Sequence, residues 1–360
     1  MKFMPTPPAV LALSIALLLA SCGGGGGSSS NKNKVVPQAT ACPSGPGTIA
    51  NTTCQVLRVV TRGNPDMNVE LRVTEPDPQA VALGTVVLSS GGLGNTFYAE
   101  QGGGDLLVQQ LSDAGWRVVD RKWEGGWFTT GTSVRNQSRR YAVLLEWIEK
   151  KVHLGGDLVA SGNSGGASEI AYALTTWPQG ALLQNSVLTA GPVMSRLDYL
   201  CTSPPTAEWA SQCAALVPPG SLSCGAPECS RTNAPACAYL DPGATPEELA
   251  EDSILHQGAL LDFGGAHVHV ALGADDCTTA APQALLFESQ IASRSTLEFV
   301  PNTPYEVAST QAGRDAIVAA LVNYSLPAPA VPPVVRERLT ILGGEGDVTV
   351  IERQAPAVSR

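Results

Sequence analysis

Residues 162 to 166, Gly-Asn-Ser-Gly-Gly, have the spacing G-x-S-x-G with Ser164 at the centre. The motif lies between a short apolar run, Leu158 to Ala160, and a helical segment, Ala167 to Thr175. Small residues on both sides of a serine allow a sharp strand-to-helix turn that lifts the hydroxyl above a sheet, where it can act as a nucleophile. The alternative is a glycine-rich turn without a chemical role, because so short a pattern also arises by chance.

In this strand-turn-helix context, residues from about 55 to 325 resemble an α/β-hydrolase with Ser164 as its nucleophile. The resemblance implies an α/β fold in which helices flank a mostly parallel sheet. It also implies two backbone N–H donors for a developing oxyanion, one of them on the residue after the nucleophile. Gly165 occupies that position.

A second glycine-rich segment, residues 89 to 95 with the sequence SSGGLGN, follows the apolar run Val86 to Leu88. It resembles the oxyanion loop of the family, and the resemblance implies that Gly92 or Leu93 supplies the other donor. A phosphate-binding loop is the alternative interpretation. The segment lacks the G-K-[ST] ending of such a loop, and no acidic ribose-binding residue follows at a convincing position.

The family places its catalytic acid after a strand that follows the nucleophile. The apolar run Val268 to Leu272 fits that strand, and the residues that follow it include Asp275 and Asp276. Family spacing favours Asp276 as the acid, although the sequence does not separate the two neighbours. The alternative is an aspartate-rich turn.

The general base departs from the family pattern. The family places a histidine in the loop after the last strand, here Thr296 to Val300, and Tyr305 occupies that position. No histidine follows His269. A phenol, with an ordinary pKa near 10, cannot serve as a base at neutral pH as an imidazole does. The triad is therefore incomplete in the sequence.

The chain has 4 histidines, and none is an obvious substitute. His256 lies near the end of an inserted segment, which could fold as a lid and bring it over Ser164. His267 and His269 lie on the strand that leads to Asp276, where packing roles are expected; together they could ligate a metal, but no third ligand is evident. His153 precedes the nucleophile strand, at the opposite edge of the sheet. We therefore expect no cofactor and no metal.

The elements that must position these residues alternate between strand and helix. Gln55 to Thr61 and Asn68 to Thr74 predict an opening hairpin. From Gly84 to Thr189, and again from Ala266 to Asn323, short apolar runs alternate with helical segments. Such alternation predicts right-handed crossovers and a mostly parallel sheet, with reactive groups at the carboxyl ends of the strands.

The cysteines are unevenly distributed. Residues 195–258 are rich in proline and cysteine and break the alternation, which predicts a lid insertion over the sheet. Cys42 and Cys54 are expected to pair, and six cysteines in or beside the lid allow three more bridges. A zinc site is the alternative, but no CxxC pair occurs. These six residues are Cys201, Cys213, Cys224, Cys229, Cys237 and Cys277.

The remaining cysteine, Cys22, lies after a segment with the features of an export signal, residues 1–21, in which Lys2 precedes an apolar run. Residues 19 to 22, Leu-Ala-Ser-Cys, resemble a bacterial lipobox, which implies acylation of Cys22; the alternative is an ordinary signal peptide. Residues 22–40 predict a Gly/Ser tether. Because glycine follows Cys22, the resemblance implies the outer membrane. The hydrolase-like domain is then residues 41–326, followed by a Pro-rich linker and a C-terminal hairpin over residues 327–360.

The composition and net charge limit the domain organisation and the class of protein. The chain has 360 residues, 44% of them hydrophobic, which suits one large domain with an insertion. Its net charge of −10 and the lack of a basic run argue against nucleic-acid binding.

Together these features predict an exported, lipid-anchored serine hydrolase that acts on a small-molecule or polymeric ester. Carboxyl-ester hydrolysis is expected because the nucleophile turn and the oxyanion loop suit acyl transfer. Without the family's histidine, either His256 supplies the base or activity is weak. The alternative is an inactive pseudo-hydrolase that binds a ligand or a protein through the lid.

Overall fold

The structure is a computed structural model that describes residues 33–129, 132–202, 207–225, 243–324, 336–342 and 348–354, together with residues 227, 229, 237 and 240. The predicted signal segment, Cys22 and the predicted linker at 327–335 lie outside the described residues. No helix within these ranges is long and apolar enough to cross a membrane.

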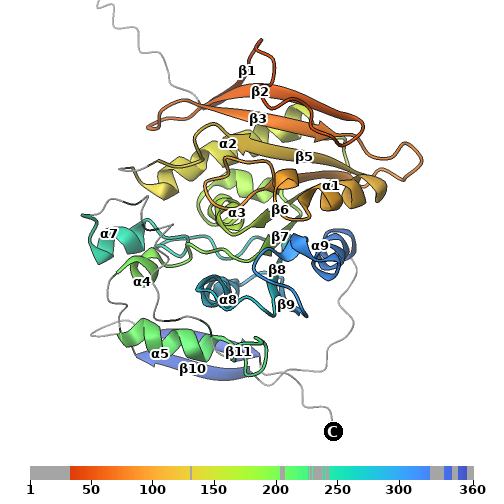
Figure 1. Cartoon of the computed structure of the whole chain (residues 1–360). Helices are drawn as coiled ribbons and strands as arrows, with labels where there is room; N and C mark the ends of the chain where they lie inside the picture. Colours follow the sequence, from red (N-terminus) through yellow and green to blue (C-terminus); the bar gives the residue numbers. More distant parts are fainter. Residues whose placement is uncertain are drawn as a thin grey trace, which may run out of the picture. The chain divides into compact units, whose positions relative to one another are not determined.

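A nine-stranded sheet forms the centre of the domain, in the order β1-β2-β3-β5-β4-β6-β7-β8-β9, which runs from top to bottom in Figure 1. The pairs β1–β2, β2–β3 and β3–β5 are antiparallel, and every later pair is parallel. The predicted mostly parallel sheet is therefore confirmed. The strands are β1 (Lys34–Pro37), β2 (Thr52–Val60), β3 (Met67–Thr74), β4 (Gly84–Ser89), β5 (Trp116–Trp123), β6 (Asp157–Asn163), β7 (Asn185–Thr189), β8 (His267–Gly273) and β9 (Ser295–Val300).

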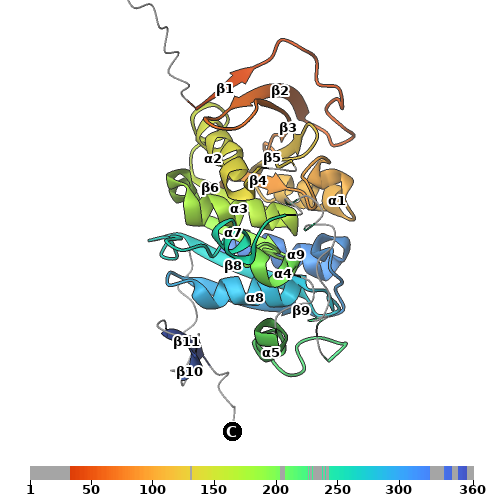
Figure 2. The same ribbon diagram turned by 90° about the vertical axis from the view of Figure 1, so that its left-hand side faces the viewer.

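Helices cover both faces of this sheet, so its central strands β4, β6, β7 and β8 are buried along almost their whole length (Figures 1 and 2). Val86 and Val87 are adjacent in β4 but belong to different cores, because successive side chains of a strand point to opposite faces. The core that contains Val87 includes Ile170 of α3, and the core that contains Val86 includes Leu107 of α1. The helices are α1 (Gly104–Asp113), α2 (Val134–Lys151), α3 (Gly165–Thr176), α8 (Ala280–Gln290) and α9 (Gln311–Asn323), with the short 3₁₀ segments η1 (Tyr98–Glu100), η2 (Pro178–Leu182) and η3 (Val307–Ser309). Helices α2, α3 and α8 pack in the first core, and α1 and α9 pack in the second.

In its described residues, the lid insertion between β7 and β8 contains the short helices α4 (Leu197–Cys201), α5 (Ala207–Leu216) and α7 (Pro246–Glu251). It docks beside α8, where the amide N–H of Arg196 donates to Oε1 of Gln283 at 2.9 Å. The predicted disulfides are present, and none of the eight cysteines is left as a thiolate for zinc. The pairs are Cys42–Cys54, Cys201–Cys237, Cys213–Cys229 and Cys224–Cys277.

The structure differs from the sequence prediction at the edge of the sheet. Lys34–Pro37, placed in the predicted tether, forms strand β1 and pairs with β2, with Val35 opposite Val59. Four residues carry too little periodicity to be recognised as a strand, and β2 supplies the hydrogen-bonding partner. At the other end of the chain, β10 (Arg336–Leu342) and β11 (Val348–Gln354) pair antiparallel where the sequence predicts a hairpin.

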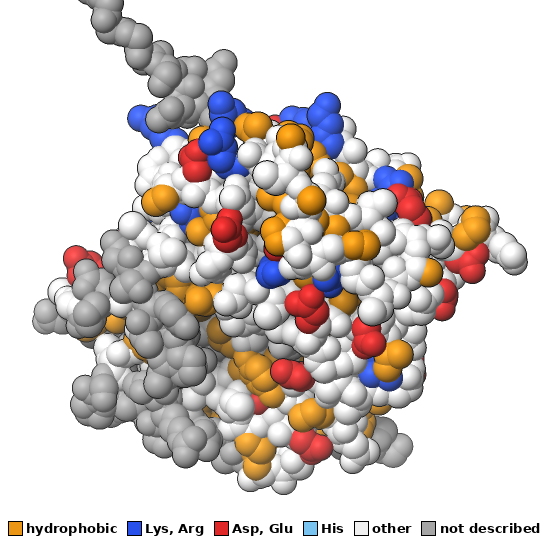
Figure 3. All heavy atoms as spheres, turned by 45° about the horizontal axis from the view of Figure 1, so that its top comes forward, with side chains coloured by type: hydrophobic (Ala, Val, Ile, Leu, Met, Phe, Trp, Pro, Cys, Tyr) orange, Lys and Arg blue, Asp and Glu red, His pale blue; other side chains and the backbone are white. Residues whose placement is uncertain are grey.

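Charged side chains are dispersed over the face shown in Figure 3. Basic side chains gather near the edge of the sheet formed by β1 and β2, and acidic side chains are scattered over the rest of the view. On this face the described residues form no continuous basic surface of the kind that nucleic-acid phosphates require.

Candidate active site

Ser164 lies at the turn between β6 and α3, with φ +56° and ψ −113°. Few non-glycine residues adopt a positive φ, and such strain is concentrated at functional sites. The turn is tight: a Cβ atom on Gly166 would collide with the carbonyl of Ser89 in β4. The amide N–H of Ser164 donates to the carbonyl of Thr189 at 2.8 Å, which ties the turn to β7. The G-x-S-x-G residues therefore form the sharp turn that their spacing predicts.

Tyr305 reaches Ser164 from the loop after β9. Its hydroxyl donates a hydrogen bond to Oγ of Ser164. Thr303 fixes this loop, because its carbonyl accepts from the amide N–H of Asp275 at 2.9 Å. The structure thus brings together two residues that are 141 positions apart in the chain.

The phenol of Tyr305 stays protonated at neutral pH. Burial raises its pKa to about 12, the hydrogen bond to Ser164 acts in the opposite direction, and the charges of Asp276 and Glu306 raise the pKa further. The loop that leads to Asp276 packs directly against the loop of Tyr305, because a Cβ atom on Gly273 would collide with the carbonyls of Thr303 and Pro304. Tyr305 is therefore a hydrogen-bond donor to Ser164 in the resting site.

Asp276 is almost fully buried, whereas Asp275 is exposed. Oδ1 of Asp276 accepts a hydrogen bond from the amide N–H of Thr278 at 3.0 Å, and Oδ2 has no partner among the described residues. Burial raises the pKa of Asp276, and the hydrogen bonds from Thr278 oppose that effect. The geometry therefore favours Asp276 over its neighbour as the acidic member of the site.

The glycine-rich segment 89–95 passes directly beside the nucleophile. A Cβ atom on Gly91 would lie 3.4 Å from Cβ of Ser164, and one on Gly165 would collide with the carbonyl of Gly92. The amide N–H groups of Gly92 and Leu93 have no hydrogen-bond partner in the described part of the chain. Gly165 is the first residue of α3, where amide N–H groups have no acceptor within the helix. Free donors thus lie on both sides of Ser164, as an oxyanion site requires.

A buried ion pair that the sequence did not predict contacts the glycine-rich segment 89–95. Arg121 of β5 and Glu169 of α3 form the pair, and both side chains are fully buried. Arg121 also donates to the carbonyl of Gly94 at 3.0 Å, and Nε1 of Trp123 donates to Oε1 of Glu169 at 2.6 Å. Burial raises the pKa of Glu169, and the contact with Arg121 opposes this. The sequence offered one indication of this pair: Arg121 and Glu169 are charged residues within otherwise largely apolar segments, where a charge needs a partner.

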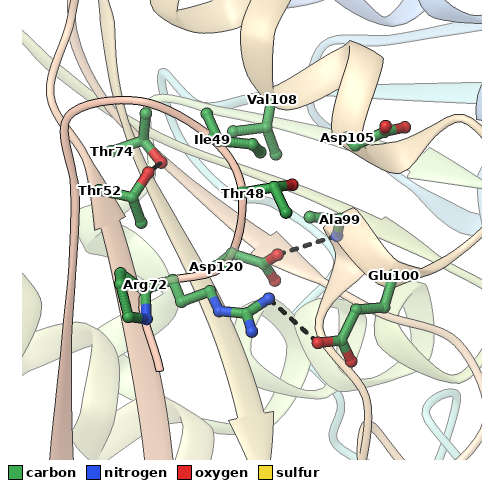
Figure 4. A pocket seen from close by; sticks show the side chains of 12 residues that line it. Thr48, Ile49, Thr52, Arg72, Thr74, Ala99, Glu100, Asp105, Val108 and Asp120 are labelled. Carbon is green, nitrogen blue, oxygen red and sulfur yellow. Dashed lines mark hydrogen bonds and ion pairs between the residues drawn. The ribbon is translucent and has the colours of Figure 1, made fainter. Parts of the chain in front are cut away.

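Asp120, next to Arg121 on β5, holds the backbone that follows the segment. Its carboxylate accepts from the amide N–H groups of Tyr98 and Ala99 at 2.8 and 2.9 Å. Figure 4 shows Asp120 in a cavity of about 210 Å³ beside the ion pair of Arg72 with Glu100. Burial raises the pKa of Asp120 to about 7, although these hydrogen bonds and the nearby arginines lower it.

The four histidines make no described contact with Ser164. Nδ1 of His256 contacts the carbonyl of Ser253 at 3.1 Å, and burial followed by the charge of Arg135 lowers its pKa. Within the described ranges no hydrogen bond or ion pair joins His256 to Ser164 or Asp276.

The other histidines have structural partners. His267 contacts Asn185 and His269 contacts Thr296, at 3.2 and 2.7 Å respectively, as expected for packing residues on the sheet. His153 donates its backbone N–H to the carbonyl of Ile148 at the end of α2. The described cysteines, histidines and acidic residues form one cluster of metal-ligand type, Cys42, Cys54 and Glu70, whose two cysteines are joined in a disulfide.

No protein-family model and no curated protein matches this sequence. Solved structures match its fold. Brefeldin A esterase, described as a bacterial homologue of human hormone-sensitive lipase, matches with a TM-score of 0.54 and 17% identity, over 80% of this chain and 79% of that protein. A bacterial heroin esterase matches with a TM-score of 0.51 and 15% identity over 76% and 84% of the two chains, and the esterase Est22 with 0.50 and 13% over 76% and 81%. The chain therefore has an α/β-hydrolase-like fold.

Proposed function

We propose that this chain is a carboxyl-ester hydrolase that acts through an acyl-enzyme on Ser164. The observation that carries the proposal is the hydrogen bond between Tyr305 and Ser164 at a strained turn, with unpartnered backbone donors beside it. A serine held in this way can attack an ester carbonyl, and the donors can stabilise the resulting oxyanion. The ester-cleaving names of the structural neighbours agree with this reaction class.

The proton route must differ from that of a serine-histidine pair. In the proposed reaction, the phenol of Tyr305 first turns its proton from Oγ of Ser164 toward Oδ2 of Asp276, so that the serine hydroxyl donates to the phenol oxygen. Oγ of Ser164 then bonds to the carbonyl carbon while its proton passes to the phenol oxygen. The proton of the phenol passes in the same step to Oδ2 of Asp276, which has no other partner among the described residues. A free tyrosinate with a pKa of about 12 would cost about 7 kcal/mol at pH 7. A concerted transfer avoids that cost, and the raised pKa of Asp276 makes it a suitable acceptor.

The rest of the cycle follows from proton and bond balance. The carbonyl oxygen becomes an oxyanion bound by the amide N–H groups of Gly165 and of Gly92 or Leu93. When the tetrahedral intermediate collapses, the ester C–O bond breaks and the alcohol takes the proton back through Tyr305. Water then attacks the acyl-enzyme and gives up one proton by the same route. The C–O bond to Ser164 breaks, Oγ takes that proton back through Tyr305, and the acid is released. No metal or cofactor takes part in these steps.

A serine-directed fluorophosphonate tests the nucleophile. We expect the wild-type chain to be labelled and Ser164→Ala to be unlabelled, whereas Ser223→Ala, an exposed lid variant, should be labelled like the wild type. Mass spectrometry of the labelled peptide locates the phosphonyl group. Equal labelling of Ser164→Ala and the wild type would show that another residue reacts.

The second candidate is a pseudo-hydrolase that binds a ligand or a protein through its disulfide-stapled lid. The high pKa of Tyr305 favours it, because a permanently protonated donor lowers the nucleophilicity of Ser164. A folded wild-type chain that neither reacts with the phosphonate nor cleaves p-nitrophenyl esters would support this candidate over the first.

We further propose that the chain is exported and anchored in the bacterial outer membrane through acylation of Cys22. The sequence around Cys22 and the four disulfides support this, because structural disulfides form in oxidising compartments. Expression in a bacterium with the native leader should give a membrane-associated product that incorporates a labelled fatty acid. Cys22→Ala should give a product without the lipid.

A further inference from the structure

The lid is tied to the loop that carries Asp276. Cys224 of the lid pairs with Cys277, which directly follows Asp276 in the chain. Beside this disulfide, the amide N–H of Ser223 donates to the carbonyl of Ala274 at 2.8 Å. The two other lid disulfides, Cys201–Cys237 and Cys213–Cys229, each join two residues of the lid. Among the described residues, Cys224–Cys277 is therefore the disulfide that connects the lid to the proposed site.

The backbone on the opposite side of this loop is bonded to the segment that leads to Tyr305. The amide N–H of Ala274 donates to the carbonyl of Val300 at 2.9 Å, next to the bond from Asp275 to Thr303. The described hydrogen bonds to the carboxyl group of Asp276 come from Thr278 alone, and its Oδ2 is unpartnered. The position of this carboxyl group relative to Tyr305 therefore depends on how the loop backbone is held, with the segment before Tyr305 on one side and the lid disulfide on the other.

We propose that the Cys224–Cys277 disulfide is a positioning element that holds Asp276 against Tyr305 and so makes the reactivity of Ser164 depend on the redox state of the lid. This inference rests on the function proposed above. Reduction by a dithiol breaks the S–S bond and leaves two thiols on the chain, and the two electrons come from the dithiol, which becomes a disulfide.

The exposure of the cysteines favours selective reduction. Cys224 is exposed, whereas Cys213 of the neighbouring bridge is fully buried. Exposed disulfides are more accessible to an attacking thiolate. The bridge also closes a long segment, with a sequence separation of 53, so breaking it releases the lid from the loop that carries Asp276. A displacement of about 1 Å at a catalytic group can cost up to about 100-fold in rate.

The test compares two double variants that each remove one bridge. Cys224→Ala/Cys277→Ala should lower kcat for a p-nitrophenyl ester about tenfold. Hydrogen exchange of the amides of residues 274–278 should become faster in this variant. Cys213→Ala/Cys229→Ala, the matched control, should leave both kcat and this exchange within twofold of the wild type. In an Asp276→Asn background, removing Cys224–Cys277 should cause no further loss of kcat, because the group that it positions is already neutralised.

Several results would overturn the inference. An equal fall of kcat in both double variants would indicate general destabilisation, and an added loss on top of Asp276→Asn would show that the disulfide acts elsewhere. If the wild-type chain has no esterase activity, the proposed function fails, but unchanged exchange at residues 274–278 would still contradict the positioning role. If the first variant does not fold, mild reduction and alkylation of the native protein, with peptide mapping to show which bridge opened, gives the same two readouts.

Discussion

Ser164 and Tyr305 form a pair in which both members are hydroxyl groups, so proton transfer between them needs a third group. A phenol with a pKa of about 12 accepts the serine proton only as it releases its own, and Asp276 is the buried carboxylate on the loop that packs against the loop of Tyr305. The pair is thus a weaker general base than an imidazole, whose ordinary pKa is near 6.5. At the residue scale, the chemistry depends on this proton relay.

Replacement of Tyr305 tests the relay directly. We expect Tyr305→Phe to lower kcat at least about 100-fold, because it removes the group that accepts the proton of Ser164. Tyr305→His should raise kcat about tenfold or more, because an imidazole between Ser164 and Asp276 can act as a base at neutral pH. Both values come from steady-state hydrolysis of p-nitrophenyl acetate.

The matched control is Tyr324→Phe, since Tyr324 stacks on His267 at the end of α9. This variant should retain wild-type kcat. If Tyr305→Phe were as active as the wild type, the phenol would have no role in proton transfer, and the relay would be wrong.

At the element scale, strand β5 holds the glycine-rich segment and the backbone that follows it, from opposite faces of the sheet. Asp120 binds the amides of residues 98 and 99 on one face, and Arg121 binds the carbonyl of Gly94 on the other. Glu169 joins Arg121 to α3, the helix that begins after the nucleophile. The positions of the oxyanion donors and of Ser164 are therefore coupled through one buried ion pair.

Removal of one member of this pair should be costly. We expect Glu169→Gln to lower the free energy of unfolding by about 3 kcal/mol, because it leaves the Arg121 guanidinium buried without a counter-charge. Glu75→Gln, which removes the partly exposed partner of Arg117, should cost less than about 1 kcal/mol. Urea denaturation followed by circular dichroism measures both. A loss for Glu169→Gln no greater than that for Glu75→Gln would show that the buried pair does not brace the two elements.

At the scale of the whole molecule, one buried carboxyl group makes stability depend on pH. The pKa of Asp120 is raised from an ordinary value of 3.8 to about 7 in the fold, so the folded chain binds more protons than the unfolded chain between these values. The stabilising contribution of this group is fully present below pH 3.8 and is lost as the pH rises through about 7.

We therefore expect the titration of Asp120 to lower the free energy of unfolding by about 3 kcal/mol between pH 5 and pH 8. In Asp120→Asn, the fall in the free energy of unfolding between pH 5 and pH 8 should be smaller by that amount. This holds whatever the effect of the substitution on stability at a single pH. Asp113→Asn, an exposed control on α1, should keep the wild-type dependence. Denaturation midpoints at four pH values in this interval test the slope, and parallel curves for Asp120→Asn and the wild type would contradict the assignment.

The sequence alone predicted the fold class and much of the candidate site. Apolar runs identify the central strands because both faces of a parallel sheet are buried, and glycine spacing marks the turn at Ser164 because larger residues would collide there. The position of Tyr305 could be predicted because a loop after a known strand returns to the same edge of the sheet. These features depend on local spacing or on topology.

Only the tertiary structure decided the remaining features. The pairing of Cys224 with Cys277 and of Arg121 with Glu169 depends on which distant segments the fold brings into contact. The spacing of residues along the chain does not indicate which distant segments meet. Strand β1 is ordered because β2 offers it an open edge. The hydrogen bond from Tyr305 to Ser164, and the unpartnered Oδ2 of Asp276 nearby, likewise arise from burial at the carboxyl end of the sheet, where side chains from three separate loops are removed from water together.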